Sequence, residues 1–464
     1  MSGGSWESGW LYQGAPKWAR GTIGAMHPKA VLDECSELVR QVLRFEHPAD
    51  ATVSRYFREN RALGPRERAT LAETVYTVLR HKLLFDHLAP SGSGPKERRL
   101  AILGFAHSED EPGTRTGSAA KQGARDFLAG ALNDQEKHWL AQCDQVQPHD
   151  LMERHRHNLP EWLVQPLREQ LKDEFWPLVE SLNRTAGLDL RVNSMTSKRA
   201  EVQAELTKAG VPATPTKYSP NGLRIDGKPN LAKLDAFNRG AVEVQDEGSQ
   251  LLALVLDAKR GEMVVDFCAG AGGKTLAIGA GMRSTGRLYA FDTSAHRLES
   301  LKPRLARSGL SNVHPVAIAH ERDDRIKRLA GKMDRVLVDA PCSGLGTLRR
   351  NPDLKWRQSP TTVAEFATLQ AAILQSAARL LKPGGRLVYA TCSVLPQENE
   401  AIALAFSAAN PGFAPLEMVD LLTQVKVEHA ASLCAGPLTG GEFLRLWPHR
   451  HGTDGFFAAA WQKQ

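Results

Sequence analysis

The chain has little cysteine and no long apolar run. Its 464 residues include six cysteines, none in the Cys-x-x-Cys spacing of a zinc site. With no secretory leader at its start, the sequence argues against a disulfide framework and for a reducing cytoplasm. Its apolar runs fall far short of the about 20 residues that cross a membrane. We therefore expect a soluble cytoplasmic protein with neither a metal nor a membrane partner.

Basic residues exceed acidic ones, and this favours a polyanionic partner. The formal net charge is +7, and such a surplus attracts nucleic acid, although it is also a common solubility device. Several of the basic residues lie near the N-terminus, on segments whose apolar residues have the spacing of a helix. They are Arg55, Arg58, Arg61, Arg66, Arg68, Arg80, His81 and Lys82. Such a stripe suits RNA phosphates, while pairing with nearby glutamates is the ordinary alternative for each arginine.

Two cysteines follow strongly apolar segments. Cys342 lies in Asp-Ala-Pro-Cys-Ser-Gly after residues 333–338, and Cys392 lies in Ala-Thr-Cys-Ser after residues 386–390. Both segments have the Val and Leu content of buried parallel strands, whose carboxyl ends carry the ligand crevice of an open α/β sheet. A lone cysteine usually fills space in a core. The adjacent Asp339, proline and glycine indicate instead that both thiols face one crevice.

A glycine-rich turn precedes these segments. Residues 263–266 predict a strand, and Cys268, Ala269, Gly270, Ala271, Gly272, Gly273 and Lys274 lead into a helix. Two known nucleotide motifs fit poorly: a P-loop needs glycine where Cys268 stands, and the glycine spacing departs from the dinucleotide fingerprint. The next predicted strand, 286–291, ends in Asp292, where a carboxylate could accept hydrogen bonds from a ribose. The turn and Asp292 together predict an adenosine-containing cofactor.

Six segments, in this order and spacing, resemble the RsmB/Nop/Sun-type RNA cytosine-5 methyltransferases. They are residues 244–250, 266–275, 339–344, 351–356, 389–396 and 454–457. The resemblance is strong over about 240–464, and residues 28–170 resemble the NusB-type helical domain of the bacterial RsmB branch. It implies S-adenosylmethionine as the cofactor and RNA as the substrate, with small-subunit (16S) ribosomal RNA ahead of transfer RNA. A noncatalytic ribosome-assembly factor is the alternative from another class, although pure binding requires neither thiol.

The resemblance also assigns roles that spacing alone leaves open. It makes Cys392 the nucleophile that adds to carbon 6 of cytosine, and Cys342 the group that assists breakdown of the adduct. Asp339 would lie beside both cofactor and base. The cofactor would contact residues 268–274, Asp292 and, as a weaker candidate, Arg297. Two departures from the family pattern are Gly270-Ala271-Gly272, where Ala-Pro-Gly is usual, and residues 318–324, where Gly-Asp is usual. The second departure leaves open which residue contacts the adenine of the cofactor. We choose Asp323 for this contact over Asp324 and His320.

These inferences predict a monomer built from four segments. A flexible extension occupies 1–25, a NusB-like all-α RNA-binding domain 26–175, a small α+β RNA-contacting module 176–240, and a Rossmann-like α/β class I methyltransferase domain 241–464. Within the module we expect strands at 188–193 and 242–244, a helix at 198–209 and loops over 211–229. Residues 108–123 are polar enough for a mobile insertion. Trp356 is expected either to stack on an unpaired nucleotide or to pack against the protein.

Overall fold

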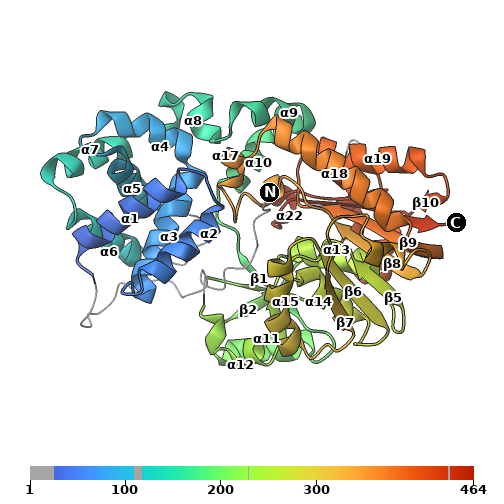
Figure 1. Ribbon diagram of the computed structural model, residues 1–464. Helices are drawn as coiled ribbons and strands as arrows, with labels where there is room; N and C mark the ends of the chain where they lie inside the picture. The colour runs from blue at the N-terminus through green and yellow to red at the C-terminus, as the bar shows by residue number, and fades with distance from the viewer. Residues whose placement is uncertain (1–25, 109–117, 228, 437–438) are drawn as a thin grey trace.

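The computed structural model describes residues 26–108, 118–227, 229–436 and 439–464. The extension predicted over 1–25 and most of the insertion predicted over 108–123 lie outside these ranges. Figure 1 shows the helical N-terminal region at one end of the molecule and the C-terminal sheet at the other, with a small sheet between and below them. Within the described residues, no helix combines the length and apolarity needed to cross a membrane.

The N-terminal region is all helical. In the first helix, Pro28 occupies the opening turn, where its missing N–H costs nothing, and apolar residues recur every three or four positions to face one core. The helices are α1 Pro28–Val42, α2 Ala49–Glu59, α3 Pro65–Arg80, α4 Lys82–Leu88, α5 Lys96–His107, α6 Ser118–Ala129, α7 Asp134–Asp144 and α8 Glu153–His157. Two more, α9 Glu161–Leu171 and α10 Phe175–Leu182, pack instead against the C-terminal domain through Leu345, Val394 and Leu395.

A small antiparallel sheet follows, in the order β2-β3-β1-β4. Its elements are β1 Leu188–Val192, α11 Arg199–Lys208, β2 Ala213–Pro215, β3 Gly222–Ile225, α12 Asp235–Asn238 and β4 Val242–Val244. Strands β1 and β4 and helix α11 agree with the prediction from the sequence. The loops predicted over 211–229 are wrong in part, because β2 and β3 lie within them. Leu188, Leu190 and Val192 face the module's own core, so Asp189, Arg191 and Asn193 point the other way.

The C-terminal domain contains a mixed sheet in the order β10-β14-β9-β8-β5-β6-β7, with β13 also pairing with β14. Strands β5 to β9 are parallel, and β14 runs antiparallel to β9. The strands are β5 Met263–Asp266, β6 Arg287–Asp292, β7 Val313–Ala317, β8 Met333–Asp339, β9 Leu381–Thr391, β10 Phe413–Pro415, β13 Phe443–Leu446 and β14 Phe456–Lys463; a separate hairpin pairs β11 Ala435–Gly436 with β12 Thr439–Gly440.

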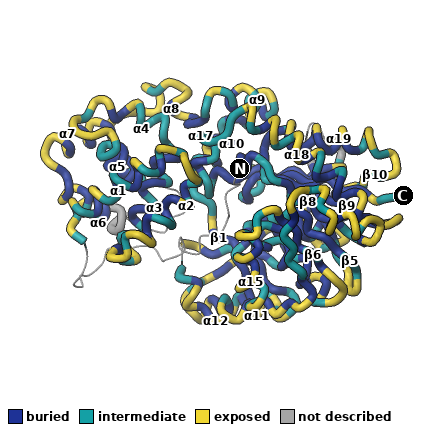
Figure 2. The backbone as a smooth tube through the Cα atoms, in the orientation of Figure 1, coloured by how far each residue is buried: buried dark blue, intermediate teal, exposed yellow. Residues whose placement is uncertain are grey.

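Helices cover both faces of this sheet and bury its central strands. They are α13 Glu247–Leu256, α14 Gly273–Gly281, α15 Ala295–Ser308, α16 Asp324–Lys327, α17 Leu354–Arg357, α18 Pro360–Ala378, α19 Glu400–Ala409, α20 Met418–Gln424, α21 Ala430–Cys434 and α22 Pro448–His451. Two separate cores result, one on each face, and Figure 2 shows the buried strands within exposed outer helices. The strand order reverses between β5 and β8, so their carboxyl ends open a crevice where ligands bind in such folds.

Candidate active site

The two strand-end cysteines lie side by side. Strands β8 and β9 pair in parallel with Asp339 opposite Ala390, so the loops that follow them leave the same edge of the sheet. Cys342 Sγ lies 3.3 Å from Cys392 Sγ. Both residues are partly exposed and neither forms a disulfide. The sheet register therefore brings together two thiols that are 50 residues apart in the chain.

One buried carboxylate ties the two cysteine loops together. Glu398 is fully buried and accepts hydrogen bonds from the Ser343 N–H at 2.8 Å and from the Ser343 and Ser393 hydroxyls at 2.5 Å each. Gln370 donates to the same carboxylate at 3.1 Å. Each serine directly follows one of the cysteines. Glu398 was not among the residues predicted for the site, because it lies 55 residues from Ser343 in the chain.

Backbone packing holds the Cys392 loop from the other side. The Gly346 N–H donates to the Cys392 carbonyl at 2.9 Å, and the Gly455 N–H donates to the Gly346 carbonyl at 2.7 Å. A Cβ on Gly346 would lie 2.1 Å from the Gly455 oxygen and 2.7 Å from the Cys392 oxygen. Only glycine permits this approach. The segment just before β14 therefore fixes the position of the thiol loop.

A buried ion pair lies next to the thiols. Lys274 Nζ donates to Asp339 Oδ2 at 2.7 Å. Burial by itself lowers the pKa of Lys274, but the negative charge of Asp339 and a smaller contribution from Cys392 outweigh it and raise that pKa. Lys274 thus stays protonated within the electrostatic reach of Cys392. The sequence had assigned Lys274 to cofactor contact, and the ion pair gives it a second partner.

The Cys342 thiol keeps its proton. The hydrogen bond with Cys392, burial and the nearby Glu398 raise the pKa of Cys342 well above the ordinary value.

The glycine turn after β5 is open on one side. Gly270 and Gly272 have φ of +56° and +88°, the left-handed region that favours glycine. A Cβ on Gly270 would meet nothing within 4 Å, whereas one on Gly272 would meet Leu301 at 2.2 Å. The buried Asp292 accepts the Gly270 N–H at 2.8 Å and the Ser294 N–H at 2.7 Å. The end of β6 therefore shapes the turn, and free space lies beside Gly270.

Asp266 contributes a buried carboxyl at the end of β5. The Thr275 hydroxyl donates to its Oδ2 at 2.7 Å, while its Oδ1 is buried without a hydrogen-bond partner among the described residues. Burial raises the pKa of Asp266 to about 7. Cys268 beside it is also held as a thiol, because burial and then Asp292 raise its pKa well above the ordinary value.

The remaining predicted cofactor residues lie along the same edge. Arg297 is in the first turn of α15, where the Ser294 hydroxyl accepts its N–H at 3.4 Å. Asp323 caps α16 and accepts the Ala319 and Arg325 N–H groups at 2.9 Å each. These backbone bonds lower the pKa of Asp323. Asp323 therefore carries a charge in the loop after β7, with both oxygens turned toward its own backbone.

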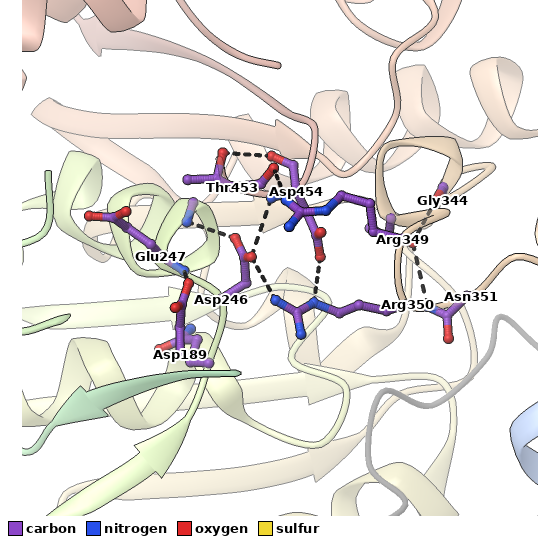
Figure 3. Close-up of polar contacts among 12 residues, drawn as sticks. Asp189, Asp246, Glu247, Gly344, Arg349, Arg350, Asn351, Thr453 and Asp454 are labelled. Atoms are coloured by element: carbon purple, nitrogen blue, oxygen red, sulfur yellow. Dashed lines mark hydrogen bonds and ion pairs between the residues drawn. The ribbon is translucent and has the colours of Figure 1, made fainter. Parts of the chain in front are cut away.

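A second ion network joins Arg350 to Asp246 and Asp454 (Figure 3). Arg350 donates to Asp454 at 2.7 Å and to Asp246 at 2.9 Å. Asp246 also caps α13 by accepting the Gly248 N–H at 2.8 Å. The neighbouring Arg349 donates to the carbonyls of Gly452 and Thr453 at 3.0 Å. This pair of arginines therefore joins the Cys342 loop to α13 and to the segment before β14.

The segment after these arginines docks the helical region. Trp356 Nε1 donates to the Leu79 carbonyl at 2.7 Å, and its ring packs against the helical core. Lys355 Nζ is buried and donates to the Arg80 carbonyl at 2.8 Å. Of the two alternatives for Trp356, the structure supports packing over base stacking. Arg80 is also buried, so it is not part of a basic surface.

Taken together, the reversed strand order, the glycine turn after β5, the acidic end of β6 and the antiparallel β14 define a Rossmann-like class I methyltransferase domain. The comparisons agree. The family described as 16S rRNA methyltransferase RsmB/F matches residues 253–462, and the RsmF/B-like ferredoxin-like domain matches residues 159–232.

Known proteins resemble the chain over nearly its whole length. The probable ribosomal RNA small subunit methyltransferase B of Synechocystis sp. is 32% identical, over 92% of this chain and 98% of its own. The ribosomal RNA small subunit methyltransferase B of Vibrio cholerae is 31% identical, over 87% and 91%. The crystal structure of PH0851 is 29% identical with a TM-score of 0.73, over 95% and 99%. The chain therefore belongs to the RsmB/Sun-type methyltransferase family.

Proposed function

We propose that the protein transfers a methyl group from S-adenosylmethionine to carbon 5 of a cytosine in small-subunit ribosomal RNA, through a transient covalent bond to Cys392. The observation that carries this proposal is the pair of thiols 3.3 Å apart at the ends of β8 and β9. Noncatalytic binding needs no thiol at this edge. The names of the curated relatives support the ribosomal substrate.

The cofactor site proposed here is the open side of the glycine turn. When bound, S-adenosylmethionine supplies an electrophilic methyl group on a sulfonium. Residues 268–274 and Asp292 would hold it, with Arg297 and Asp323 as outer contacts. Two features fit such a group: the open space beside Gly270 and the buried Asp266 oxygen without a partner.

The proposed chemistry uses the two thiols in different roles. Carbon 5 of cytosine is a weak nucleophile, so the Cys392 thiolate first adds to carbon 6 and makes carbon 5 a carbanion equivalent. Asp339 hydrogen-bonds the cytosine edge during this attack. After carbon 5 has gained the methyl group, a base takes the proton from carbon 5, the double bond between carbons 5 and 6 re-forms, and Cys392 leaves carbon 6 as a thiolate. Cys342, held close by Ser343 and Glu398, assists this release.

The proposed organisation assigns RNA binding to the other two domains. We place a NusB-like helical domain at 26–175, an RNA-contacting module at 176–240 and the methyltransferase domain at 241–464. Exposed Arg58, Arg61 and Arg66 on and beside α2 and α3 support a phosphate contact. The buried Arg80 is left out of it.

The test uses both single cysteine variants with undermodified total RNA and tritiated S-adenosylmethionine. Cys392→Ala is expected to lose methylation and adduct formation, because the attacking sulfur is absent. Cys342→Ala is expected to accumulate a covalent protein–RNA complex, because release is slowed. A denaturing gel separates labelled RNA from labelled protein, and digestion of the RNA locates the label on cytosine.

The outcomes separate the competing functions. The reverse pattern between the two variants would exchange the thiol roles. Label in transfer RNA would show that transfer RNA, and not ribosomal RNA, is the substrate. Cofactor binding without label in any RNA would favour the noncatalytic assembly factor.

A further inference from the structure

A second polar cavity lies away from the thiols, at the opposite edge of the sheet. It has a volume of about 570 Å³ and is bounded by the small module, α13, α14 and the end of α20. Residues 257–260, which precede β5, and the last turn of α14 line it. The glycine turn lies at the other end of α14, roughly 14 Å away for a helix of nine residues. The cavity is therefore distinct from the proposed cofactor site.

The charge of the cavity is strongly positive. Five cationic residues line it: Arg191, Lys259, Arg260, Arg283 and Lys426. Asp257 is its one acidic lining residue. Three helices end here, at Leu256, Gly281 and Gln424, and each C-terminus carries about half a negative charge. These helix ends and Asp257 together supply about −2.5, so the five cations leave the cavity at about +2.5.

The floor of the cavity contains a buried guanidinium. Arg191 is 5% exposed, and its Nε donates to the neutral Gln245 side chain at 2.6 Å. It lies opposite Glu243 in the pairing of β1 with β4, but burial outweighs the charge of Glu243 and lowers the pKa of Arg191 to about 10. Among the described residues no ion pair includes Arg191, and Glu243 pairs instead with Arg304 and Arg307. An anion in the cavity would offset part of the cost of burying this cation.

Further donors lie around this guanidinium. The Asn221 side chain, which lines the same cavity, has no hydrogen-bond partner within the described ranges. At the rim, Arg260 and Lys426 are exposed and likewise make no side-chain bond to a described residue. Lysine would suffice for a diffuse attraction, but a buried arginine and an amide offer the directed donors that bind phosphate oxygens.

We propose that this cavity binds a backbone phosphate of the RNA substrate. The inference rests on the proposed RNA substrate. The volume of the cavity lies within the range of ligand pockets, and the roughly 14 Å along α14 between the cavity and the glycine turn corresponds to about four nucleotide steps of a stacked strand. The contact would fix the register of the RNA without reading its sequence.

The test reverses the two rim charges in the full-length protein as Arg260→Glu/Lys426→Glu. The matched control is Arg328→Glu/Arg379→Glu, an equal change at two exposed arginines that cap the ends of α16 and α18. Binding of an unmodified small-subunit ribosomal RNA transcript is measured by filter retention over a salt series. S-adenosylmethionine binding, measured by calorimetry, reports separately on the fold of each variant.

The rim variant is expected to bind the transcript at least about tenfold more weakly, with a salt slope smaller by about 1, because the contact with one phosphate is lost. Arg191→Gln should weaken RNA binding in the same direction. The control should stay within about twofold of wild type. Equal affinities of the rim variant and the control would overturn the inference.

Two further outcomes identify what failed. A wild type that binds S-adenosylmethionine but not the transcript overturns the proposed substrate, and the phosphate contact with it. Inorganic phosphate, titrated at constant ionic strength, tests for a free anion. Binding of phosphate that depends on Arg191, with RNA affinity indifferent to the rim, would overturn the RNA contact in favour of a small anion.

Discussion

At the residue scale, the site depends on carboxyl groups that differ in their surroundings. Asp339 pairs with Lys274, Glu398 accepts four hydrogen bonds from three residues, and Asp266 has one oxygen without a partner among the described residues. A buried carboxyl with few donors favours its neutral form. Asp266 is therefore the carboxyl of the site whose charge should respond to pH near neutrality.

This property predicts a pH-dependent stability. Burial raises the pKa of Asp266 from 3.8 to about 7, so the folded protein holds a proton that the unfolded chain releases. The contribution of protonated Asp266 to the stability of the fold is complete below about pH 4 and is lost as the pH rises through about 7. Asp266→Asn removes the titration. We expect the difference in melting temperature, wild type minus Asp266→Asn, to decrease as the pH rises from about 5 to about 8.

The control for this experiment is the exposed Asp235, which lies in the short helix α12. Asp235→Asn should give a nearly constant difference from wild type across the same range. A constant difference for Asp266→Asn as well would show that Asp266 is already ionised in the folded protein.

At the element scale, the loop after β8 and the segment before β14 meet at two glycines. Gly346→Ala would place a Cβ 2.1 Å from the Gly455 oxygen, and backbone on both sides leaves it no room. We expect a loss of about 1–3 kcal/mol in unfolding free energy. A shift of about 1 Å at the Cys392 loop would also cost about 100-fold in methylation rate.

Gly412→Ala is the matched control, because a Cβ there meets nothing within 4 Å and its φ is negative. Chemical denaturation and single-turnover methylation would be measured on both variants. Wild-type rates in Gly346→Ala would mean that Cys392 does not depend on this contact.

The same scale shows what the sequence could predict. Apolar runs located β5, β6, β8 and the end of β9, because parallel strands buried on both faces have continuous Val and Leu content. Strands β2 and β3 were missed because each is short and lies in a segment rich in proline and glycine. Proline is tolerated in β2 because it is an edge strand. Their pairing with β1 depends on contacts between residues far apart in the chain.

Side-chain networks were less predictable than strands. The thiol pair followed from two strand ends at one edge of a sheet. The bonds that Glu398 accepts from Ser343 and Ser393 depend on rotamers, and those from Ser343 also span 55 residues of the chain. The sequence also left two alternatives for Trp356, stacking on a nucleotide or packing within the protein. An aromatic ring beside cations has the same sequence pattern on an RNA-binding surface and in a domain interface.

At the scale of the whole molecule, Trp356 connects the helical region to the catalytic domain. Trp356→Ala removes the bond to the Leu79 carbonyl and the ring that packs on the helical core. We expect the helical region to unfold in a separate transition at lower temperature, because the coupling between the two regions is weakened. Differential scanning calorimetry measures this directly.

Trp356→Phe is the companion variant. It keeps most of the ring area and loses only the indole N–H, so its unfolding should stay closer to wild type. A single unchanged transition in Trp356→Ala would mean that other contacts, such as Lys355 with Arg80, suffice to couple the two regions.

The contact between Gly346 and Gly455 has a consequence for biosynthesis. Chains leave the ribosome from the N-terminus, and domains fold as they emerge. The helical region can form its core early, but the Cys392 loop lacks its support until residues 454–463 have been made. A nascent chain would therefore carry both thiols before the Cys392 loop is held in place.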